Sequence, residues 1–160
     1  PIGRDRGQSM TLENLIGRSL EAITPDSASI ARLIEASQSS LADARVSQLS
    51  AESRFDLAYK SIMQAANAAL QANGYRTRTS VPGHHQTMIQ TLPRTIGLDT
   101  STMVLLDQIR KQRNEIDYSG DQVSDTLANE AVHHAELLLK RVVNWLRQYR
   151  PELLPRAQLP

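Results

Sequence analysis

The chain has 160 residues, enough for one domain with a single hydrophobic core. Hydrophobic residues make up 40% of the chain but aromatic residues only 4%, so the core must be mainly aliphatic, which favours packed helices over a β-sandwich. The absence of cysteine excludes disulfides, thiolate metal sites and cysteine nucleophiles. No apolar run approaches the roughly 20 residues of a membrane helix, and no apolar segment typical of a secretory signal is visible near the start. We therefore expect a cytoplasmic protein that is not associated with a membrane.

Positive charge is concentrated in one part of the chain, although the net charge is only +1. Six basic and two acidic residues lie between Arg76 and Arg113, and arginines outnumber lysines 15 to 3 over the whole chain. An arginine can bind a phosphate with two parallel hydrogen bonds, whereas a lysine binds it as a point charge. The positive charge between Arg76 and Arg113 therefore favours a partner that carries phosphate. The alternative is that these residues only form a solvated surface that binds no ligand.

Apolar residues at helical spacing divide the chain into segments separated by prolines, glycines and capping residues. Helices are predicted over residues 11–22, 28–46, 51–73, 84–92, 101–116 and 125–149. The predicted N-caps are a residue of the segment 24–27, then Ser50, then Asp99 or Thr100, and finally Ser124. Gly74 is predicted to stop the helix before it, and residues 75–83 and 94–98 are predicted as a loop and a turn. No segment alternates with the period of a strand.

These segments predict an all-α protein, an up-down antiparallel bundle of four to five main helices. Residues 11–150 are predicted to form a single helical domain. Residues 1–10 are expected to be a flexible N-terminal segment. Residues 151–160 contain three prolines and are expected to form a mobile tail.

The densest polar stretch covers residues 110–118 of the fifth predicted helix. Ile109 and Ile116 are seven residues apart and share the buried face, which Gln112 and Arg113 interrupt. Asp117 follows Arg113 by four residues, within reach of an ion pair. An arginine on a packing face is costly unless it is paired or faces a polar cleft. Two interpretations stay open, a partly buried pair that only fixes helix packing and a functional arginine.

Two pairs of consecutive histidines occur, His84 with His85 and His133 with His134. Neighbouring residues of a helix point in different directions, so each pair offers one ligand to a given site. Glu130 and His133 have the spacing of helical di-iron sites, but no second copy of the motif exists, so we expect no metal and no other cofactor. His134 is interpreted as a hydrogen-bonded core histidine. A further hypothesis places His84 or His85 beside Arg113 as an acid/base group.

The string of residues 57–76, with its Ala-Tyr pair, alanine-rich middle and final Gly-Tyr, resembles the second helix of HEPN domains. The Gly-His-His turn at 83–85, the Arg-Asn-x-x-Asp-Tyr string at 113–118 and the long last helix continue the resemblance in the same order. It covers residues 28–148. It implies a HEPN-like bundle of the type that binds nucleotidyltransferase substrates, commonly a homodimer.

Many HEPN proteins are metal-independent ribonucleases of toxin–antitoxin, CRISPR or anti-phage systems, and others accompany a small nucleotidyltransferase. By this resemblance Arg113 matches the motif arginine and Asn114 the polar residue after it. Tyr118 or Gly120 stands where the ribonucleases carry a histidine. A phenol, with an unperturbed pKa of about 10, is a poor general base at neutral pH. Tyr118 is instead a hypothetical target for nucleotide attachment by a partner nucleotidyltransferase.

The sequence therefore predicts a HEPN-like module that binds RNA or a nucleotide, a partner nucleotidyltransferase, or both, in a toxin–antitoxin or defence setting. The predicted binding residues are Arg76, Arg78, His84, His85, Arg110, Arg113 and Asp117. Alternatives are a weak metal-independent ribonuclease that uses Arg113 and Asn114, with Tyr118 as a third catalytic candidate, and a non-catalytic structural partner subunit. In each functional interpretation Arg113 is expected to face a groove between two copies of the bundle.

Overall fold

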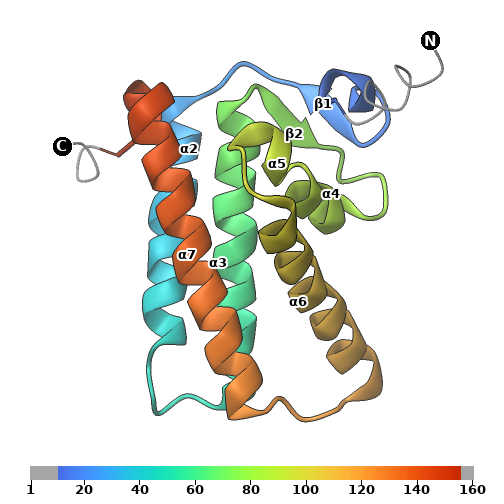
Figure 1. Cartoon of the computed structure of the whole chain (residues 1–160), viewed down its shortest axis with the longest axis vertical. Helices are drawn as coiled ribbons and strands as arrows, with labels where there is room; N and C mark the ends of the chain where they lie inside the picture. The colour runs from blue at the N-terminus through green and yellow to red at the C-terminus, as the bar shows by residue number, and fades with distance from the viewer. Residues whose placement is uncertain (1–10, 156–160) are drawn as a thin grey trace.

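The computed structural model describes residues 11–155, most of which are helical (Figure 1). The main helices alternate in direction along the bundle, and the predicted all-α class is confirmed. The described helices are α2 (Ser27–Ala44), α3 (Ala51–Ala72), α4 (His84–Gln90), α5 (Leu92–Thr95), α6 (Thr100–Ser119) and α7 (Asp125–Tyr149). Two 3₁₀ helices, η1 (Glu13–Leu15) and η2 (Pro151–Leu153), lie near the two ends of the described chain. The segment 1–10, predicted to be flexible, lies outside the described residues.

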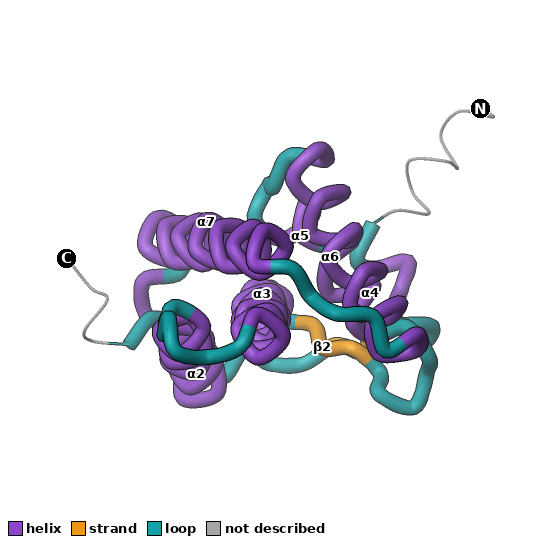
Figure 2. Tube along the Cα trace, turned by 90° about the horizontal axis from the view of Figure 1, so that it is seen from below, coloured by secondary structure: helices purple, strands orange, loops and turns teal. Residues whose placement is uncertain are grey.

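Helix α3 is the central element of the bundle. Viewed along the helices it lies between α2, α7 and the pair formed by α4 and α6 (Figure 2). Its buried face is rich in alanine, and Ala65, Ala68, Ala69 and Ala72 are fully buried. Such small side chains let the neighbouring helices approach closely. Between α2 and α3 the buried hydroxyls of Ser37 and Ser61 each donate to the backbone carbonyl of the other residue at 2.9 Å.

Side-chain caps start the four long helices, as their sequences predict. Asp26, Ser50, Asp99 and Ser124 each accept a hydrogen bond from the backbone N–H three residues later, which satisfies one of the free donors of the first turn. The three hydrogen bonds from Ser101 and Thr102 hold the pKa of Asp99 below its usual range. At the end of α3, Gly74 has φ of +90°, a conformation that favours glycine, and the predicted stop is confirmed.

The N-terminal part departs from the prediction of a helix over residues 11–22. Only η1 is helical, and the chain then turns at Gly17, which has φ of +83°, into strand β1 (Leu20–Ala22). This strand pairs antiparallel with β2 (Tyr75–Thr77), inside the segment predicted as a loop. Leu20 is fully buried. The helix prediction was wrong because this leucine lies in a strand whose partner, Thr77, is far away in the sequence, which local periodicity does not reveal.

The C-terminal segment is partly packed, against the prediction of a mobile tail from residue 151. Leu153 and Leu154 are only 4% and 7% exposed, and η2 contacts both α2 and α7. Arg150 donates from Nη1 to the carbonyl of Ala72 at 3.0 Å, which ties the end of α7 to the end of α3. The tail prediction is therefore wrong for residues 151–155, because the two leucines complete the core. Residues 156–160 lie outside the described part of the chain.

Two helix boundaries also differ from the prediction. The segment predicted as one helix and a turn, residues 84–98, contains the two short helices α4 and α5. Pro93 lies within the first residues of α5, where its missing N–H removes no helical hydrogen bond. Helix α6 continues to Ser119, three residues beyond the predicted end.

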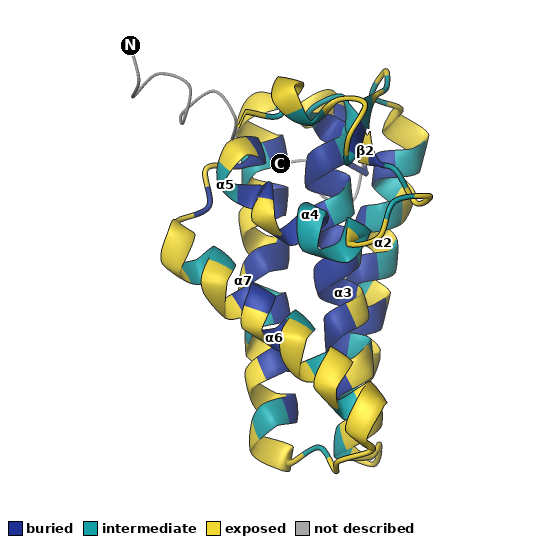
Figure 3. Ribbon diagram, turned by 90° about the vertical axis from the view of Figure 1, so that its right-hand side faces the viewer, coloured by how far each residue is buried: buried dark blue, intermediate teal, exposed yellow. Residues whose placement is uncertain are grey.

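The burial pattern places the exposed face of α6 on the outside of the bundle (Figure 3). Leu106, Asp107 and Ile109 are its buried residues, and beyond them Arg113 and Ile116 are only partly buried. The C-terminal half of α6 diverges from α7 (Figure 1). Gln112 is exposed, so the prediction that it shares the packing face is wrong: the face follows positions 106, 109, 113 and 116. Within residues 11–155, no helix is both long and apolar enough to cross a bilayer.

Candidate functional site

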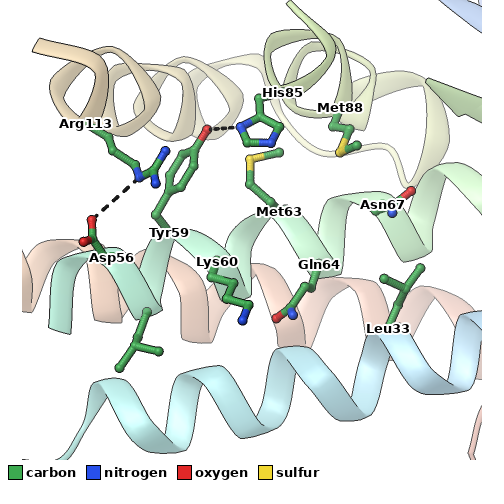
Figure 4. A pocket seen from close by; sticks show the side chains of 11 residues that line it. Leu33, Asp56, Tyr59, Lys60, Met63, Gln64, Asn67, His85, Met88 and Arg113 are labelled. Carbon is green, nitrogen blue, oxygen red and sulfur yellow. Dashed lines mark hydrogen bonds and ion pairs between the residues drawn. The ribbon is translucent and has the colours of Figure 1, made fainter. Parts of the chain in front are cut away.

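A cavity of about 430 Å³ runs along one side of α3 (Figure 4). Helix α3 forms its floor, α2 contributes one wall, and α4 and α6 contribute the other. Its lining residues combine aliphatic and thioether side chains with charged, amide and aromatic ones: Leu33, Asp56, Leu57, Tyr59, Lys60, Met63, Gln64, Asn67, His85, Met88 and Arg113. The volume is within the range typical of small-ligand sites, which are mostly apolar with a few polar groups.

Arg113 reaches this cavity from α6 and is held by three groups. Its guanidinium lies 4.8 Å from the centroid of the Tyr59 ring. Nε is 3.6 Å from Oδ1 of Asp56, and Nη1 is 3.8 Å from Oδ2 of Asp117. The side chain is 32% exposed, but its Nε atom is buried and has no hydrogen-bond partner. Both ion pairs are long and half exposed, so they neutralise the guanidinium only weakly. A buried N–H without an acceptor is energetically costly.

Tyr59 connects Arg113 to the histidine pair on α4. Its hydroxyl is 3.0 Å from Nδ1 of His85, and the tyrosine itself is only 3% exposed. Burial raises the pKa of Tyr59 to about 12, so the phenol keeps its proton at neutral pH. Burial lowers the pKa of His85 from 6.5, and the nearby charges of His84, Arg113 and Arg110 lower it further. The imidazole is therefore neutral at pH 7, beside a permanent positive charge.

Of the two histidines that were predicted to lie near Arg113, only His85 does so. His85 and Arg113 line the same cavity from different helices, with Tyr59 between them. The ring of His84 lies edge-on to that of His85, with centroids 4.6 Å apart, and does not line the cavity. His85 and Arg113 therefore lie close together, and the acid/base role of His85 stays a hypothesis.

Arg110 is engaged in packing. Its Nε donates to Oδ1 of Asp107 at 2.7 Å, and the side chains are only 13% and 9% exposed. Lys111 adds a second, longer contact of 3.7 Å to the same carboxylate. Arg110 does not line the cavity and affects it through its charge, and its predicted contact with a ligand stays a prediction.

Asn114 and Tyr118 lie outside the Arg113 cavity, although they follow Arg113 in the matched motif. Both are exposed and border a shallow depression with Glu115, Ser119 and Asp121. Tyr118 is 97% exposed. One residue along a helix turns a side chain by about 100°, which carries Asn114 off the face that Arg113 occupies. The structure therefore does not bring the three predicted catalytic candidates into one site.

The loop arginines bind the β-ribbon. Arg76 donates to Oε1 of Glu21 at 2.6 Å across the strand pair, and Arg78 donates to the carbonyl of Gly17. Neither lines the Arg113 cavity. Tyr75–Thr77 pairs with β1 at the far end of α3, so the structure does not bring these two predicted binding residues together with Arg113.

Of the lining residues that were missed as functional candidates, Asp56, Tyr59, Lys60, Gln64 and Asn67 are the polar ones, and all five lie on α3. Asp56, Tyr59 and Lys60 lie within two turns and line the cavity together. Tyr59 has the position of a core residue in the apolar stripe, and its hydroxyl gives no signal in sequence. A signal for the missed residues is visible in the sequence. Polar residues three or four positions apart form a polar face beside the core: Asp56, Lys60, Gln64 and Asn67.

The cavity beside Arg113 is formed within one chain. The expectation was a groove between two copies, but α3, α4 and α6 of a single chain enclose the guanidinium. A second copy is not required to build this site.

The second histidine pair lies on α7, where the ring centroids are 5.8 Å apart. Burial, followed by the charge of His133, lowers the pKa of the half-buried His134. Within the described residues no hydrogen bond to His134 is present, so it is not the hydrogen-bonded core histidine expected. Among residues 11–155, no three histidine or carboxylate side chains lie close enough together to hold a metal ion.

The arrangement has the chemistry of an anion site with an apolar floor. A fixed guanidinium and Lys60 supply positive charge, while Leu57, Met63 and Met88 supply apolar surface. Comparison of the chain with protein-family models, with curated proteins and with solved structures finds no match.

Proposed function

We propose that this protein is a HEPN-like helical module that binds a nucleotide, free or at the end of an RNA strand, in the cavity beside Arg113. The observation that carries the proposal is the guanidinium of Arg113, whose side chain lines the cavity, is 32% exposed and is held only by two long ion pairs. A phosphate oxygen is an acceptor of the right charge for this group. The order of the HEPN-like motifs along the chain is the second support.

The rest of the cavity suits the remainder of a nucleotide. Met63, Met88 and Leu57 offer apolar contact to a base. The amides of Gln64 and Asn67 also line the cavity and are hydrogen-bonded to Ser40 and Gln71. Lys60 has no carboxylate within ion-pair distance among the described residues, so its charge is available to a phosphate. Ligand sites of this size commonly combine an apolar lining with a few polar groups.

The test measures binding of adenosine 5′-monophosphate and of a fluorescent oligouridylate by titration calorimetry and fluorescence anisotropy. Arg113→Ala should weaken binding of both at least about tenfold, the scale of one charged hydrogen bond. Arg113→Lys should recover only part of the affinity, because a lysine lacks the planar fork. Arg141→Ala, on an exposed arginine of α7 outside the cavity, is the matched control. Unchanged affinity in Arg113→Ala would refute the proposal.

A second candidate, a weak metal-independent ribonuclease, is favoured by the location of His85 in the same cavity. In this reaction the neutral imidazole accepts the proton of a 2′-hydroxyl and the 2′-oxygen attacks phosphorus. The bond from phosphorus to the 5′-oxygen breaks as that oxygen takes a proton from water, and the imidazolium neutralises the hydroxide left behind. The products are a 2′,3′-cyclic phosphate and a 5′-hydroxyl, with Arg113 stabilising the charge on the phosphoryl oxygens. It ranks second because Asn114 and Tyr118 lie outside the cavity. Cyclic-phosphate ends that disappear in both His85→Gln and Arg113→Ala would support it.

A partner nucleotidyltransferase is the third element of the proposal, and the exposure of Tyr118 favours it. A phenol that is 97% exposed is accessible to another protein's active site. Its oxygen would attack the α-phosphorus of a nucleoside triphosphate, releasing pyrophosphate and giving up its proton to the partner. Intact mass after co-expression with a neighbouring nucleotidyltransferase should rise by one nucleotidyl group, and Tyr118→Phe should prevent the increase. An unchanged mass would exclude nucleotide attachment at Tyr118, and the chain could then be only a structural partner of a nucleotidyltransferase.

The proposal includes a homodimer and a toxin–antitoxin or defence setting, both from the resemblance to HEPN domains. Sedimentation equilibrium tests the first, with twice the chain mass as the expected result. The second is tested by growth of cells that express the chain with and without its neighbouring genes.

A further inference from the structure

A separate cavity of about 330 Å³ lies on the opposite side of α4 from the Arg113 cavity. Gln86 and Gln90 of α4 line it, whereas His85 and Met88 of the same helix line the Arg113 cavity. Successive residues of a helix are about 100° apart, which places these two pairs on opposite faces of α4. The two cavities have no lining residue in common, so the second one is a distinct candidate site.

Segments that are far apart in the sequence form this cavity, at the end of the bundle where α4, α5 and the two strands gather (Figure 1). One wall is a stripe over residues 86–94, which stays continuous because Thr91 has helical φ and ψ and joins α4 to α5. Ser19, just before β1, and Pro82, in the turn before α4, complete the wall. The backbone N–H of Arg78 donates to the carbonyl of Ser19 at 3.0 Å, next to the paired strands, and so holds these two segments together.

Arg94 is the charged residue among the described residues that line the cavity. Within the described part of the chain, its exposed guanidinium has neither a carboxylate at ion-pair distance nor a hydrogen-bond acceptor. Arg110, by contrast, donates to Asp107 at 2.7 Å. A guanidinium presents its N–H donors in one plane, which matches the oxygens of a carboxylate or a phosphate. The cavity therefore suits a ligand with one anionic group.

The other polar side chains of the cavity are neutral and offer both donors and acceptors. The amides of Gln86 and Gln90 and the hydroxyl of Ser19 make no hydrogen bond to other residues of the described chain. Thr87 and Thr91 donate their hydroxyl protons to backbone carbonyls of the preceding turn, at 3.2 and 2.8 Å, so toward a ligand they act as acceptors. A hydroxyl group both donates and accepts, and several ligand hydroxyls would match this lining.

We propose that this cavity binds a monosaccharide that carries one anionic group, a phosphate ester or a carboxylate. Arg94 contacts the anionic group, and the amides of Gln86 and Gln90 contact the sugar hydroxyls. The volume of about 330 Å³ is at the lower end of the range of small-ligand sites, which suits one sugar ring better than a polymer.

Other classes of small molecule match the described lining less well. A free amino acid would place its ammonium group where no carboxylate lines the cavity, and a dicarboxylate would bring a second charge with one arginine to bind it. A nucleobase would meet no aromatic ring among these lining residues. An apolar ligand would remove water from the amides without replacing its hydrogen bonds.

The experiment records amide NMR spectra of the full chain during titration with glucose 6-phosphate, glucuronate, glucose or inorganic phosphate. A sugar anion should shift the backbone amides of Thr87 and Thr91. It should bind at least about tenfold more tightly than glucose, which lacks the charge, and than phosphate, which lacks the sugar hydroxyls. The tighter of the two sugar anions identifies the anionic group as a phosphate ester or a carboxylate.

Four variants locate the binding. Arg94→Ala should weaken binding of the sugar anion at least about tenfold, by loss of a charged hydrogen bond, and Gln90→Ala about threefold, by loss of a neutral one. Arg113→Ala, in the other cavity, and Arg141→Ala, on the exposed surface of α7, should leave the affinity unchanged. Thermal unfolding verifies that each variant is folded.

Three results would overturn the proposal. The first is the absence of shifts with both sugar anions, and the second is an equal affinity for inorganic phosphate. The third is an affinity for the sugar anion that Arg94→Ala leaves unchanged or that Arg113→Ala lowers, which would place the ligand elsewhere. Nucleotide binding is tested with a different ligand and depends on Arg113, so the two proposals fail independently.

Discussion

The guanidinium of Arg113 lies over the ring of Tyr59, 4.8 Å from its centroid. The contact joins α6 to α3 where α6 begins to diverge from the bundle. An aromatic face attracts a cation by about 0.5–2 kcal/mol, more where water is excluded. The ring therefore fixes the direction of the guanidinium without neutralising its charge, which a carboxylate in the same position would do.

Replacing Tyr59 separates the roles of its ring and its hydroxyl. Tyr59→Phe keeps the ring beneath Arg113, so nucleotide affinity should change by no more than about threefold. Tyr59→Leu removes the ring and should weaken binding about tenfold, because Arg113 loses its orientation. Titration calorimetry with adenosine 5′-monophosphate measures both, and equal losses in the two variants would show that the ring has no part in positioning Arg113.

Binding of a phosphodiester should strengthen as pH falls below 6.5. The pKa of His85 is lowered by burial and by the charges of His84, Arg113 and Arg110, so the imidazole becomes cationic only below its ordinary value. The added positive charge then attracts the ligand. Uridylyl-uridine is the suitable probe because its single phosphodiester keeps a constant charge between pH 5 and 8. His85→Gln should make the affinity independent of pH over this range, and a persistent rise in that variant would place the titrating group elsewhere.

The free energy of unfolding should decrease between pH 7 and pH 5. Burial lowers the pKa of both His85 and His134 in the folded chain. The unfolded chain therefore binds more protons below about pH 6.5, and protonation favours unfolding. Carboxylates with lowered pKa, such as Glu136, lose their contribution only as pH falls below their ordinary value of 4.5. Thermal unfolding at pH 5, 6 and 7 checks the slope, which a His85→Gln/His134→Gln double variant should reduce.

The packed C-terminal segment should contribute measurably to stability. Leu153→Ala and Leu154→Ala each remove a buried side chain and should cost about 2–5 kcal/mol in the free energy of unfolding. Leu137→Ala, at a leucine that is 43% exposed on α7, is the matched control and should have a much smaller effect. Urea unfolding measures all three. Equal, small effects would mean that the segment makes no stabilising contact.

The cap of α7 gives a further stability prediction. Ser124 accepts from the N–H of Leu127 at 3.1 Å. Ser124→Ala should lower the free energy of unfolding by about 1 kcal/mol, whereas Ser124→Asp should preserve it, because aspartate caps equally well. Urea unfolding measures both variants. If the contact were incidental and not a cap, the two substitutions would change the free energy of unfolding equally.

The long helices and their caps were predictable because their signals are local. Ser50, Asp99 and Ser124 each begin a helix through a hydrogen bond three residues away, and Gly74 ends one. The burial of Leu20 was not predictable in the same way, since it depends on a partner strand 55 residues later. The packing of Leu153 likewise depends on surfaces of α2 and α7, which no local pattern reveals.

The candidate site was predictable only in part. Arg113 was found because a charge on an apolar helix face is anomalous, and His85 because histidines are few. Tyr59 and Asp56 complete the site from α3, and their role depends on how close α6 approaches that helix. Arg110 carries the same charge one turn before Arg113, yet the nearby Asp107 neutralises it. Sequence alone could not show that one of these two arginines is neutralised and the other is not.

The alanine-rich face of α3 has a thermodynamic consequence for the whole bundle. Alanine loses almost no rotamer freedom on burial, whereas long side chains lose up to about 2 kcal/mol each. The alanines of the central helix, which α2, α4 and α7 all contact, are therefore buried with little loss of side-chain entropy. That loss falls instead on the larger buried residues, such as Phe55 and Leu70 of α3 and Leu138 of α7.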